Sequence, residues 1–550
     1  MGGGGYPLFQ AGVYNRKVRT PACSRLLAAA VLLVGTCLAA AQNHDSPAEG
    51  KTPGDVILVL PFDNRSGNPS LNWVGDSFPD TLNQRLSSAG FLTITRDDRL
   101  FALDHLGLPT DFRPSRATTI RMAQTLDADY VIVGSYNLQN GRISVQAQVL
   151  NTNKLSLSAP LEDSSELPRL LDVENAIAWK VARHIEPQFA VAEQTFLSAS
   201  SGVQLSALEN YIRGTDAPTS AERIKRLQKA VADSSTYAAA ELALGKELYA
   251  VRDYAKAANV LAKVSLADRQ ALEANFYLGL ARFNETRYAE AEQAFTFVAS
   301  RLPLPEVVND QGVALARQNQ DGSSFFQRAS NADPNEPDYH YNLAVSHLKQ
   351  GDFAGAQREI EQTSKLRPSD TEAAELRTLI SAGRSAAKPA NAFEPAARLR
   401  RTYSEASFRQ AAAQLDQMRA LRMATLPPAQ QSTEYTQLGR DYLSQGLLPE
   451  AEKEFNAAVN ANPANSQAHA GLAQVRERSA SLDDARTEAL ASLKLSPSIE
   501  PYLILARLDL QKKDYTAAAA EVQKALTIEP KNAAALSLQQ SLTTHGQSFQ

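Results

Sequence analysis

Cysteine is nearly absent from this 550-residue chain, and its two cysteines, Cys23 and Cys37, both lie in the first 41 residues. The rest of the sequence therefore has no residue that could form a disulfide, act as a thiol nucleophile or bind a metal through a thiolate. A chain without cysteine also tolerates an oxidising compartment, although no disulfide stabilises it there. This absence excludes cysteine-dependent enzymes and thiolate metal centres.

The sequence also lacks an excess of positive charge. Its formal net charge is −4, and the first 41 residues contribute four basic side chains and no acidic one, which leaves −4 − 4 = −8 for the remainder. Proteins that bind nucleic acids neutralise phosphates with clustered lysines and arginines. We therefore expect no nucleic-acid partner.

The apolar run at residues 26–41, LLAAAVLLVGTCLAAA, is short for a membrane span. It follows the basic stretch RKVRTPACSR and ends in small residues, a pattern that predicts a signal peptide at residues 1–41, cleaved before Gln42, and a linker at 42–54. We expect an exported protein of the periplasm or cell envelope. Two alternatives stay open, an uncleaved membrane anchor and a lipid on Cys37, because VGTC loosely resembles a lipobox.

Sequence motifs of catalytic and metal sites are missing as well. The sequence contains no G-x-S-x-G and no H-E-x-x-H motif, and residues 63–68, DNRSGN, lack the glycine spacing and the lysine of a phosphate-binding loop. None of the seven histidines has a second histidine at the spacing of a helical metal site. We predict a non-enzymatic protein without metal or cofactor, while a hydrolase site built from distant segments stays open.

A repeat is present instead. Prolines close similar stretches at separations of 31, 34, 95, 34 and 33 residues, and each stretch contains two patterns of helical period. In STEYTQLGRDYLSQGLLPEAEKEFNAAVNANP, Gly439 and Ala451 are small enough for two helices to touch, Phe455 fills the space around that contact, and Pro463 ends the second helix. The prolines are Pro303, Pro334, Pro368, Pro463, Pro497 and Pro530.

These positions resemble those of the tetratricopeptide repeat, a helix–turn–helix unit of 34 residues. The repeats are predicted near 238–271, 272–305, 306–336, 337–370, 432–465, 466–498 and 499–532, with a degenerate repeat at 204–237, a shortened one at 306–336 and a terminal helix at 533–545. The solenoid is thus expected in two blocks, 204–380 and 432–550, separated by a linker at 381–395 and a non-repeat helical segment at 396–431.

Residues 55–187 follow a different pattern, in which strands alternate with helices. DVILVLPF is a buried strand, Ser77 is expected to cap a helix, and Asn140-Gly141 marks a hairpin. The predicted fold class is α+β multidomain, a small α/β sandwich followed by an all-α superhelical solenoid. The stretches VLPFDNRSGN and ADYVIVGSY resemble the TolB-like amino-terminal domain, which is related to a domain of the flagellar lipoprotein FlgO. Many such domains carry a signalling module in front, whereas an export signal stands here.

The resemblance to tetratricopeptide repeats also implies a binding surface, because first helices line the inner face in that family. Matching positions give aromatic and basic residues in the first block and three arginines in the second. Whether the aromatic residues bind a partner or pack only against neighbouring repeats stays open. The candidate residues are Lys246, Tyr249, Phe276, Phe283, Tyr341, Arg440, Arg478 and Arg507, with Leu280, Val345, Lys349, Thr436, Gln474, Leu503 and Gln511 beside them.

The leading hypothesis is an exported scaffold whose repeats hold a protein partner in an extended or helical conformation. The alternative is an envelope sensor, in which the α/β domain binds a small ligand and the repeats relay the result to a partner. The lysine and asparagine pattern with which some repeats clamp a peptide carboxylate is absent, so binding of a chaperone tail is not expected.

Overall fold

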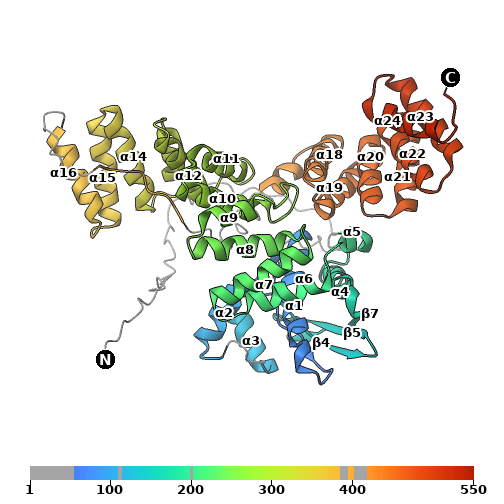
Figure 1. Ribbon diagram of the computed structural model, residues 1–550, viewed down its shortest axis with the longest axis horizontal. Coiled ribbons are helices and arrows are strands. Elements are labelled where there is room, and N and C mark those ends of the chain that lie inside the picture. Colours follow the sequence, from blue (N-terminus) through green and yellow to red (C-terminus); the bar gives the residue numbers. More distant parts are fainter. Residues whose placement is uncertain (1–54, 110–113, 199–201, 384–393, 402–417, 550) are drawn as a thin grey trace, which may run out of the picture. The chain divides into compact units, whose positions relative to one another are not determined.

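The computed structural model describes residues 55–109, 114–198, 202–383, 394–401 and 418–549 (Figure 1). The signal peptide and linker predicted at residues 1–54, and most of the linker predicted at 381–395, lie outside these residues. No helix in the described ranges is long and apolar enough to cross a membrane.

The amino-terminal part contains a mixed sheet of seven strands (Figure 1). Strand β1 pairs in parallel with β3 and β4, and β5 pairs antiparallel with β4, β6 and β7, while the short β2 joins the edge of β4. The strands are β1 (Val56–Val59), β2 (Asp63–Asn64), β3 (Leu92–Thr93), β4 (Tyr130–Gln139), β5 (Arg142–Asn151), β6 (Ser156–Leu157) and β7 (Leu161–Glu166).

Helices cover both faces of this sheet. Side chains of β1 and of the next residue alternate, so that Ile57 and Val59 pack with α1 and α4, whereas Leu58 and Leu60 pack with α2 and α3. A strand buried on both faces explains the continuous apolar run VILVL. The helices are α1 (Asn72–Ser88), α2 (Arg96–His105), α3 (Arg116–Thr125), α4 (Leu170–Ile185) and α5 (Glu193–Ser198), with short 3₁₀ helices η1 (Pro69–Leu71) and η2 (Leu167–Arg169).

The hairpin predicted at Asn140-Gly141 is confirmed. Strands β4 and β5 pair from Tyr130 opposite Asn151 to Gln139 opposite Arg142, and both turn residues have positive φ, 53° and 79°. The cap predicted at Ser77 is wrong, because α1 begins five residues earlier, at Asn72 after η1. Ser77 lies inside the helix, where its buried hydroxyl donates a hydrogen bond to Glu174 of α4.

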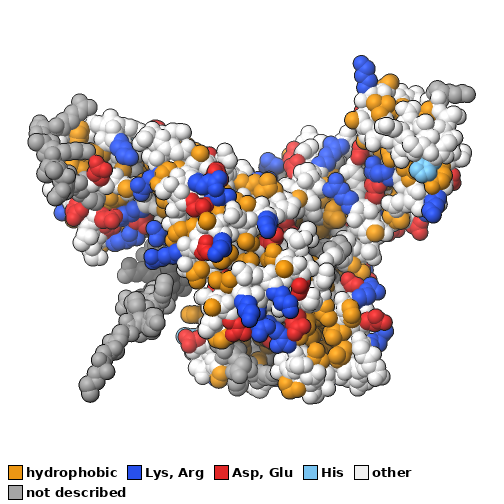
Figure 2. All heavy atoms as spheres, viewed as in Figure 1, with side chains coloured by type: hydrophobic (Ala, Val, Ile, Leu, Met, Phe, Trp, Pro, Cys, Tyr) orange, Lys and Arg blue, Asp and Glu red, His pale blue; other side chains and the backbone are white. Residues whose placement is uncertain are grey.

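Most of the remaining described chain consists of paired helices. In the first block these are α6 (Leu205–Thr215), α7 (Ser220–Asp233), α8 (Ala238–Ala250), α9 (Tyr254–Leu261), α10 (Ala271–Asn284), α11 (Tyr288–Ala299), α12 (Pro305–Arg317), α13 (Ser323–Ala332), α14 (Pro337–Gln350), α15 (Phe353–Leu366) and α16 (Thr371–Ala382). In the second they are α18 (Pro428–Ser444), α19 (Leu448–Ala461), α20 (Ser466–Arg478), α21 (Leu482–Leu495), α22 (Ile499–Gln511), α23 (Tyr515–Ile528) and α24 (Ala533–Thr544). On the face drawn in Figure 2, basic side chains lie among acidic ones.

In several repeats a glycine of the first helix faces a large side chain of the second, as the repeat pattern predicted. A Cβ atom added at Gly439 would lie 2.7 Å from the ring of Phe455, and one at Gly279 would lie 2.6 Å from Phe295. In the shortened repeat the partner of Gly312 is Phe326, two residues nearer along the chain (455 − 439 = 16, 326 − 312 = 14). The close helix contact therefore survives the deletion in the turn.

The α/β domain and the first repeats share one hydrophobic core. Phe78 and Leu82 of α1 belong to the same buried cluster as Leu208 of α6 and Leu244 of α8. The second block contacts this region through Glu452 of α19, which is fully buried. Its carboxylate accepts hydrogen bonds from the Ala192 N–H, at 3.0 Å, and from the hydroxyl of Thr195, and it pairs with Arg476 at 2.7 Å.

Candidate functional site

Residues 394–401, EPAARLRR, lie against the first helices of the first block and form neither helix nor strand. This corrects the helical segment predicted from residue 396 onward, as far as residue 401. The physical reason is that side chains of the repeats bond the main chain of this segment, which leaves those groups unavailable for helical hydrogen bonds. We call residues 394–401 the groove segment.

Two buried asparagines hold its main chain. The Nδ2 of Asn342 donates to the carbonyl oxygen of Arg398 at 2.8 Å, and its Oδ1 accepts from the Arg398 N–H at 2.6 Å. Asn309 donates to the same carbonyl at 3.1 Å, and Asn342 donates to Asn309 at 2.7 Å. These contacts recognise the peptide backbone and are independent of the side chain at position 398.

The side chain of Arg398 is bound by acidic residues. Its guanidinium lies 2.6 Å from Asp370, 3.0 Å from Asp338 and 3.0 Å from Glu372. It also stacks on Tyr341, with 3.6 Å from the guanidinium carbon to the ring centroid. The hydrogen bond from Arg398 lowers the pKa of the Asp370 carboxyl, which keeps that group ionised.

Arg400 makes a second set of polar contacts. Its guanidinium pairs with Glu336 at 3.1 Å and lies 3.5 Å from Asp338, while the main-chain N–H of Arg400 donates to Oδ1 of Asp310 at 2.7 Å. Asp310 is fully buried, and burial raises the pKa of its carboxyl well above the usual range. Among the described residues, neither Oδ2 of Asp310 nor Nε of Arg400 has a hydrogen-bond partner.

Apolar residues alternate with these arginines. Ala397 is buried with Val313 and Phe326, and Leu399 packs against the cluster that contains Phe276 and borders on Phe283. The alternation of apolar and charged contacts over residues 397–400 is that of an extended chain. The groove thus binds two arginine side chains, Arg398 and Arg400, and the aliphatic side chain of Leu399 between them.

The predicted residues of the first block divide into three groups. Tyr341 stacks on Arg398 of the groove segment, and Phe283 packs against the buried cluster that contains Ala397 of that segment. Phe276 is fully buried against Phe295, so in this structure it offers no surface to a partner. Lys246 pairs with Glu273, and Tyr249 packs on Tyr254 and Tyr277.

The three arginines predicted in the second block do not form one site. Arg440 is exposed, whereas Arg478 donates to the carbonyl oxygen of Leu443 at 3.0 Å. Arg507 forms two hydrogen bonds with Glu477, at 2.6 and 2.7 Å, which raise the pKa of its guanidinium. Arg478 and Arg507 thus form hydrogen bonds with residues of neighbouring helices of the solenoid.

Sequence reasoning missed the residues that bind the groove segment, namely Asn309, Asp310, Asn342, Asp338 and Asp370. Their first signal was the alternation in ARLR, but it stood in a region interpreted as linker and helix. A second signal was polar residues on first helices where an apolar core was expected. Their function depends on contact with a segment that lies between 28 residues (398 − 370) and 90 residues (400 − 310) further along the chain, and no local pattern encodes such contacts.

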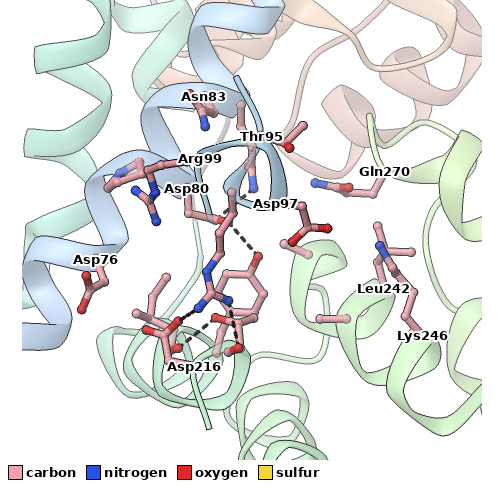
Figure 3. A pocket seen from close by; sticks show the side chains of 18 of the residues that line it. Asp76, Asp80, Asn83, Thr95, Asp97, Arg99, Asp216, Leu242, Lys246 and Gln270 are labelled. Atoms are coloured by element: carbon pink, nitrogen blue, oxygen red, sulfur yellow. Dashed lines mark hydrogen bonds and ion pairs between the residues drawn. The ribbon is translucent and has the colours of Figure 1, made fainter. Parts of the chain in front are cut away.

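A second candidate is a cavity of about 720 Å³ between α1 and α2 of the α/β domain and the repeat helices α6, α8 and α10 (Figure 3). Its lining is charged but largely paired. Arg96 bonds Asp216 and the carbonyl oxygen of Thr215, and Tyr211 donates to Asp80 at 2.9 Å. Such pairing leaves little unmatched charge to select a ligand.

A buried carboxyl lies under α1. Glu174 of α4 is fully buried and accepts hydrogen bonds from Ser77 and, at 2.6 Å, from Thr81. Burial raises its pKa to about 7. Both hydroxyl groups that bond Glu174 lie on α1, so this carboxyl group helps to hold α1 against α4.

The histidines of the repeats also have packing partners. Nδ1 of His340 lies 2.7 Å from Glu359, and His469 has the same distance to Glu488 at the equivalent position. The ring Nε2 atoms lie 3.1 Å from the carbonyl oxygens of Pro334 and Pro463. In the part of the chain that the structure describes, no three His, Cys, Asp or Glu side chains cluster in a way that could hold a metal ion.

Family comparisons confirm the repeats. Models of the tetratricopeptide repeat match residues 242–303 and 436–498, residues 314–380, and residues 499–532. The chain therefore carries tetratricopeptide repeats in both blocks, and such repeats serve as scaffolds for protein–protein interaction. No curated protein matches the sequence.

Solved structures are similar over parts of the chain. The LpoB C-terminal domain from Salmonella enterica is 20% identical, with TM-score 0.19, over 22% of this chain and 87% of that one. MamA from Desulfovibrio magneticus RS-1 is 19% identical, with TM-score 0.27, over 33% and 99%. YrrB, described as a tetratricopeptide protein with an unusual peptide-binding site, is 16% identical, with TM-score 0.29, over 37% and 99%. At these TM-scores the similarities support no conclusion on function.

Proposed function

We propose that the chain is a non-enzymatic scaffold of the bacterial cell envelope that holds a protein partner as an extended segment in the groove of the first block. The observation that supports this most strongly is the groove segment itself. Asn309 and Asn342 bond its main chain, and a main-chain contact of this kind accepts any extended peptide that fits the pockets beside it. Tetratricopeptide repeats supply the rigid helices that position these side chains.

Affinity capture from bacterial envelope extracts tests this function. The full chain and the control Lys365→Ala, which changes an exposed residue of α15, should capture the same partner. The double variant Asn309→Ala and Asn342→Ala should lose that partner, because the groove then has no donor for the main chain. Equal capture by all three proteins would place binding on another surface.

Export is the second part of the proposal, and the basic and apolar pattern of residues 16–41 supports it. The mature protein should begin near Gln42 and fractionate with the periplasm or the envelope. The α/β domain, which resembles the TolB-like domain, would dock the scaffold to another envelope component. An intact Met1 on protein from the cytoplasm would contradict export, and diacylated Cys37 would favour the lipid anchor.

A ligand sensor is the second candidate, and the cavity in Figure 3 is the observation that favours it. Because the cavity is bordered by both the α/β domain and the repeats, a ligand there would contact both. Nη1 of Arg99, which lines the cavity, is buried without a hydrogen-bond partner among the described residues, so it can bind the carboxylate of a small ligand such as a free amino acid. Thermal shift assays with amino acids should then raise the melting temperature of the full chain and leave that of Arg99→Gln unchanged.

A further inference from the structure

We propose that the partner of the first block presents an extended segment with the pattern arginine–aliphatic–arginine, and that residues 394–401 are the chain's own occupant of this site, which the partner replaces. The inference rests on the proposed function and adds to it the chemistry of the partner and the competition that binding requires.

The charge of the groove demands a basic occupant. Five carboxyl groups surround the segment, those of Asp310, Glu336, Asp338, Asp370 and Glu372. Among the repeat residues, Arg367 is the cation that pairs with three of them, namely Glu336, Asp338 and Asp370. Without Arg398 and Arg400, the groove would hold an unbalanced cluster of partly buried negative charge, which is unfavourable in a medium of low polarity.

Arginine fits this site better than lysine. Nη1 of Arg398 donates to Asp338 and Asp370, Nη2 donates to Asp370 and Glu372, and the guanidinium stacks on Tyr341. A lysine ammonium is a compact charge without a plane, so it can neither bridge these carboxylates at once nor stack in the same way. The position between the two cations requires an aliphatic residue, because Leu399 at this position packs among apolar side chains.

The present occupant fits incompletely. Oδ2 of the fully buried Asp310 and Nε of Arg400 are both buried, and neither has a hydrogen-bond partner among the described residues. A buried polar atom without a partner weakens binding. Residues 394–401 are attached to the rest of this chain, which restricts their position. A segment of another protein is free of that restriction, so its second arginine can be placed to bond Asp310. Such a partner can compete with an occupant that has the advantage of being attached.

Competition is measured with the full chain and labelled octapeptides. The double variant Arg398→Ala and Arg400→Ala weakens the internal occupant, and we call it the opened chain. Fluorescence anisotropy should show that the opened chain binds EPAARLRR at least tenfold more tightly than the wild type does. EPAAKLKR and EPAAALAR should bind the opened chain at least tenfold more weakly than EPAARLRR. Lys365→Ala should behave as the wild type, and adding Asn342→Ala to the opened chain should abolish binding.

A second measurement does not depend on the stability of the opened chain. Cys23 and Cys37 are replaced by serine, and Ala397→Cys places one thiol in the buried part of the groove segment. Saturating EPAARLRR should increase the rate of thiol labelling at least tenfold, whereas EPAAALAR should not. A thiol introduced by Lys365→Cys, on the exposed face of α15, should react at the same rate with and without peptide.

The outcomes separate the two proposals. Equal affinity of the opened chain for all three peptides would overturn the arginine pattern while leaving a groove that binds extended segments. Unchanged labelling of Ala397→Cys at a peptide concentration that saturates anisotropy would overturn the competition. Failure of the opened chain to bind any peptide would overturn this inference. The proposed function itself fails only if capture of a protein partner is independent of Asn309 and Asn342.

Discussion

Asn342 bonds both polar groups of the Arg398 main chain, donating to its carbonyl oxygen at 2.8 Å and accepting from its N–H at 2.6 Å. Through this side-chain amide, the helices of the first block bind the main chain of an extended segment. It lies on α14, one turn after Asp338, which binds the side chain of the same arginine. Backbone and side chain of one residue are therefore recognised from one helix.

The first prediction concerns protection of the groove segment. Asn342→Ala should increase the rate of tryptic cleavage after Arg398 by at least tenfold, because the main chain there loses two hydrogen bonds and leaves its buried position more often. Mass spectrometry of the early fragments measures the site and the rate. Asn331→Ala, an exposed asparagine of α13, is the matched control. Equal cleavage in both variants would mean that Asn342 does not hold the segment.

The second prediction concerns the contact of the two blocks. Glu452→Ala removes the buried acceptor of Ala192 and Thr195 and leaves Arg476 without its ion-pair partner. Breaking a buried pair in this way costs about 3–5 kcal/mol. Hydrogen exchange should rise around residues 190–195 and in α19. Asn460→Ala, exposed on the same helix, should leave exchange unchanged; a similar rise there would show that α19 itself is unstable.

The third prediction concerns the helix contact inside a repeat. Gly439→Leu should destabilise the second block by about 1–3 kcal/mol, since even its Cβ would lie 2.7 Å from the ring of Phe455. That ring is fully buried and is also close to Gly471, so it has little room to move. Urea unfolding measures the change. Gln437→Leu, at an exposed position of α18, should unfold as the wild type does.

The fourth prediction concerns the turn of a repeat. Thr286 follows α10 with φ of 62°, a left-handed conformation that is unfavourable for a β-branched residue, whereas Gly351 has φ of 79° at the equivalent turn. Thr286→Gly should stabilise the protein by about 0.5–1 kcal/mol in thermal unfolding. The converse change, Gly351→Thr, should destabilise it. A loss of stability in Thr286→Gly would show that contacts of the threonine side chain stabilise the protein by more than its left-handed conformation destabilises it.

The fifth prediction concerns pH. The pKa of Glu174 is raised from 4.5 to about 7 by burial, so between these values the folded protein binds a proton that the unfolded chain releases. The free energy of unfolding should therefore fall as pH rises through this window, by roughly 3 kcal/mol, and level off above it. Glu174→Gln should remove this slope. A slope of the same size in the variant would assign the pH dependence to other groups.

The sequence by itself determined the repeats, because their contacts are local. Gly439 meets Phe455 sixteen residues later (455 − 439 = 16), and a contact at a fixed short separation leaves a periodic pattern. The hairpin at Asn140-Gly141 is local in the same sense, since a turn with two positive φ angles favours these residue types. The alternation of strands and helices likewise indicated the α/β domain, although α2 and β7 were missed.

Only the tertiary structure decided where function can lie. Residues 394–401 span the end of the predicted linker and the start of the predicted helical segment. They become an occupant of the groove only because Asn309, Asp310 and Asn342 face them across the fold. Phe276 matched the pattern of a surface residue but is buried, since its exposure depends on how adjacent repeats pack. Burial, pairing of charges and contact between distant segments are properties of the folded chain, and residue spacing does not encode them.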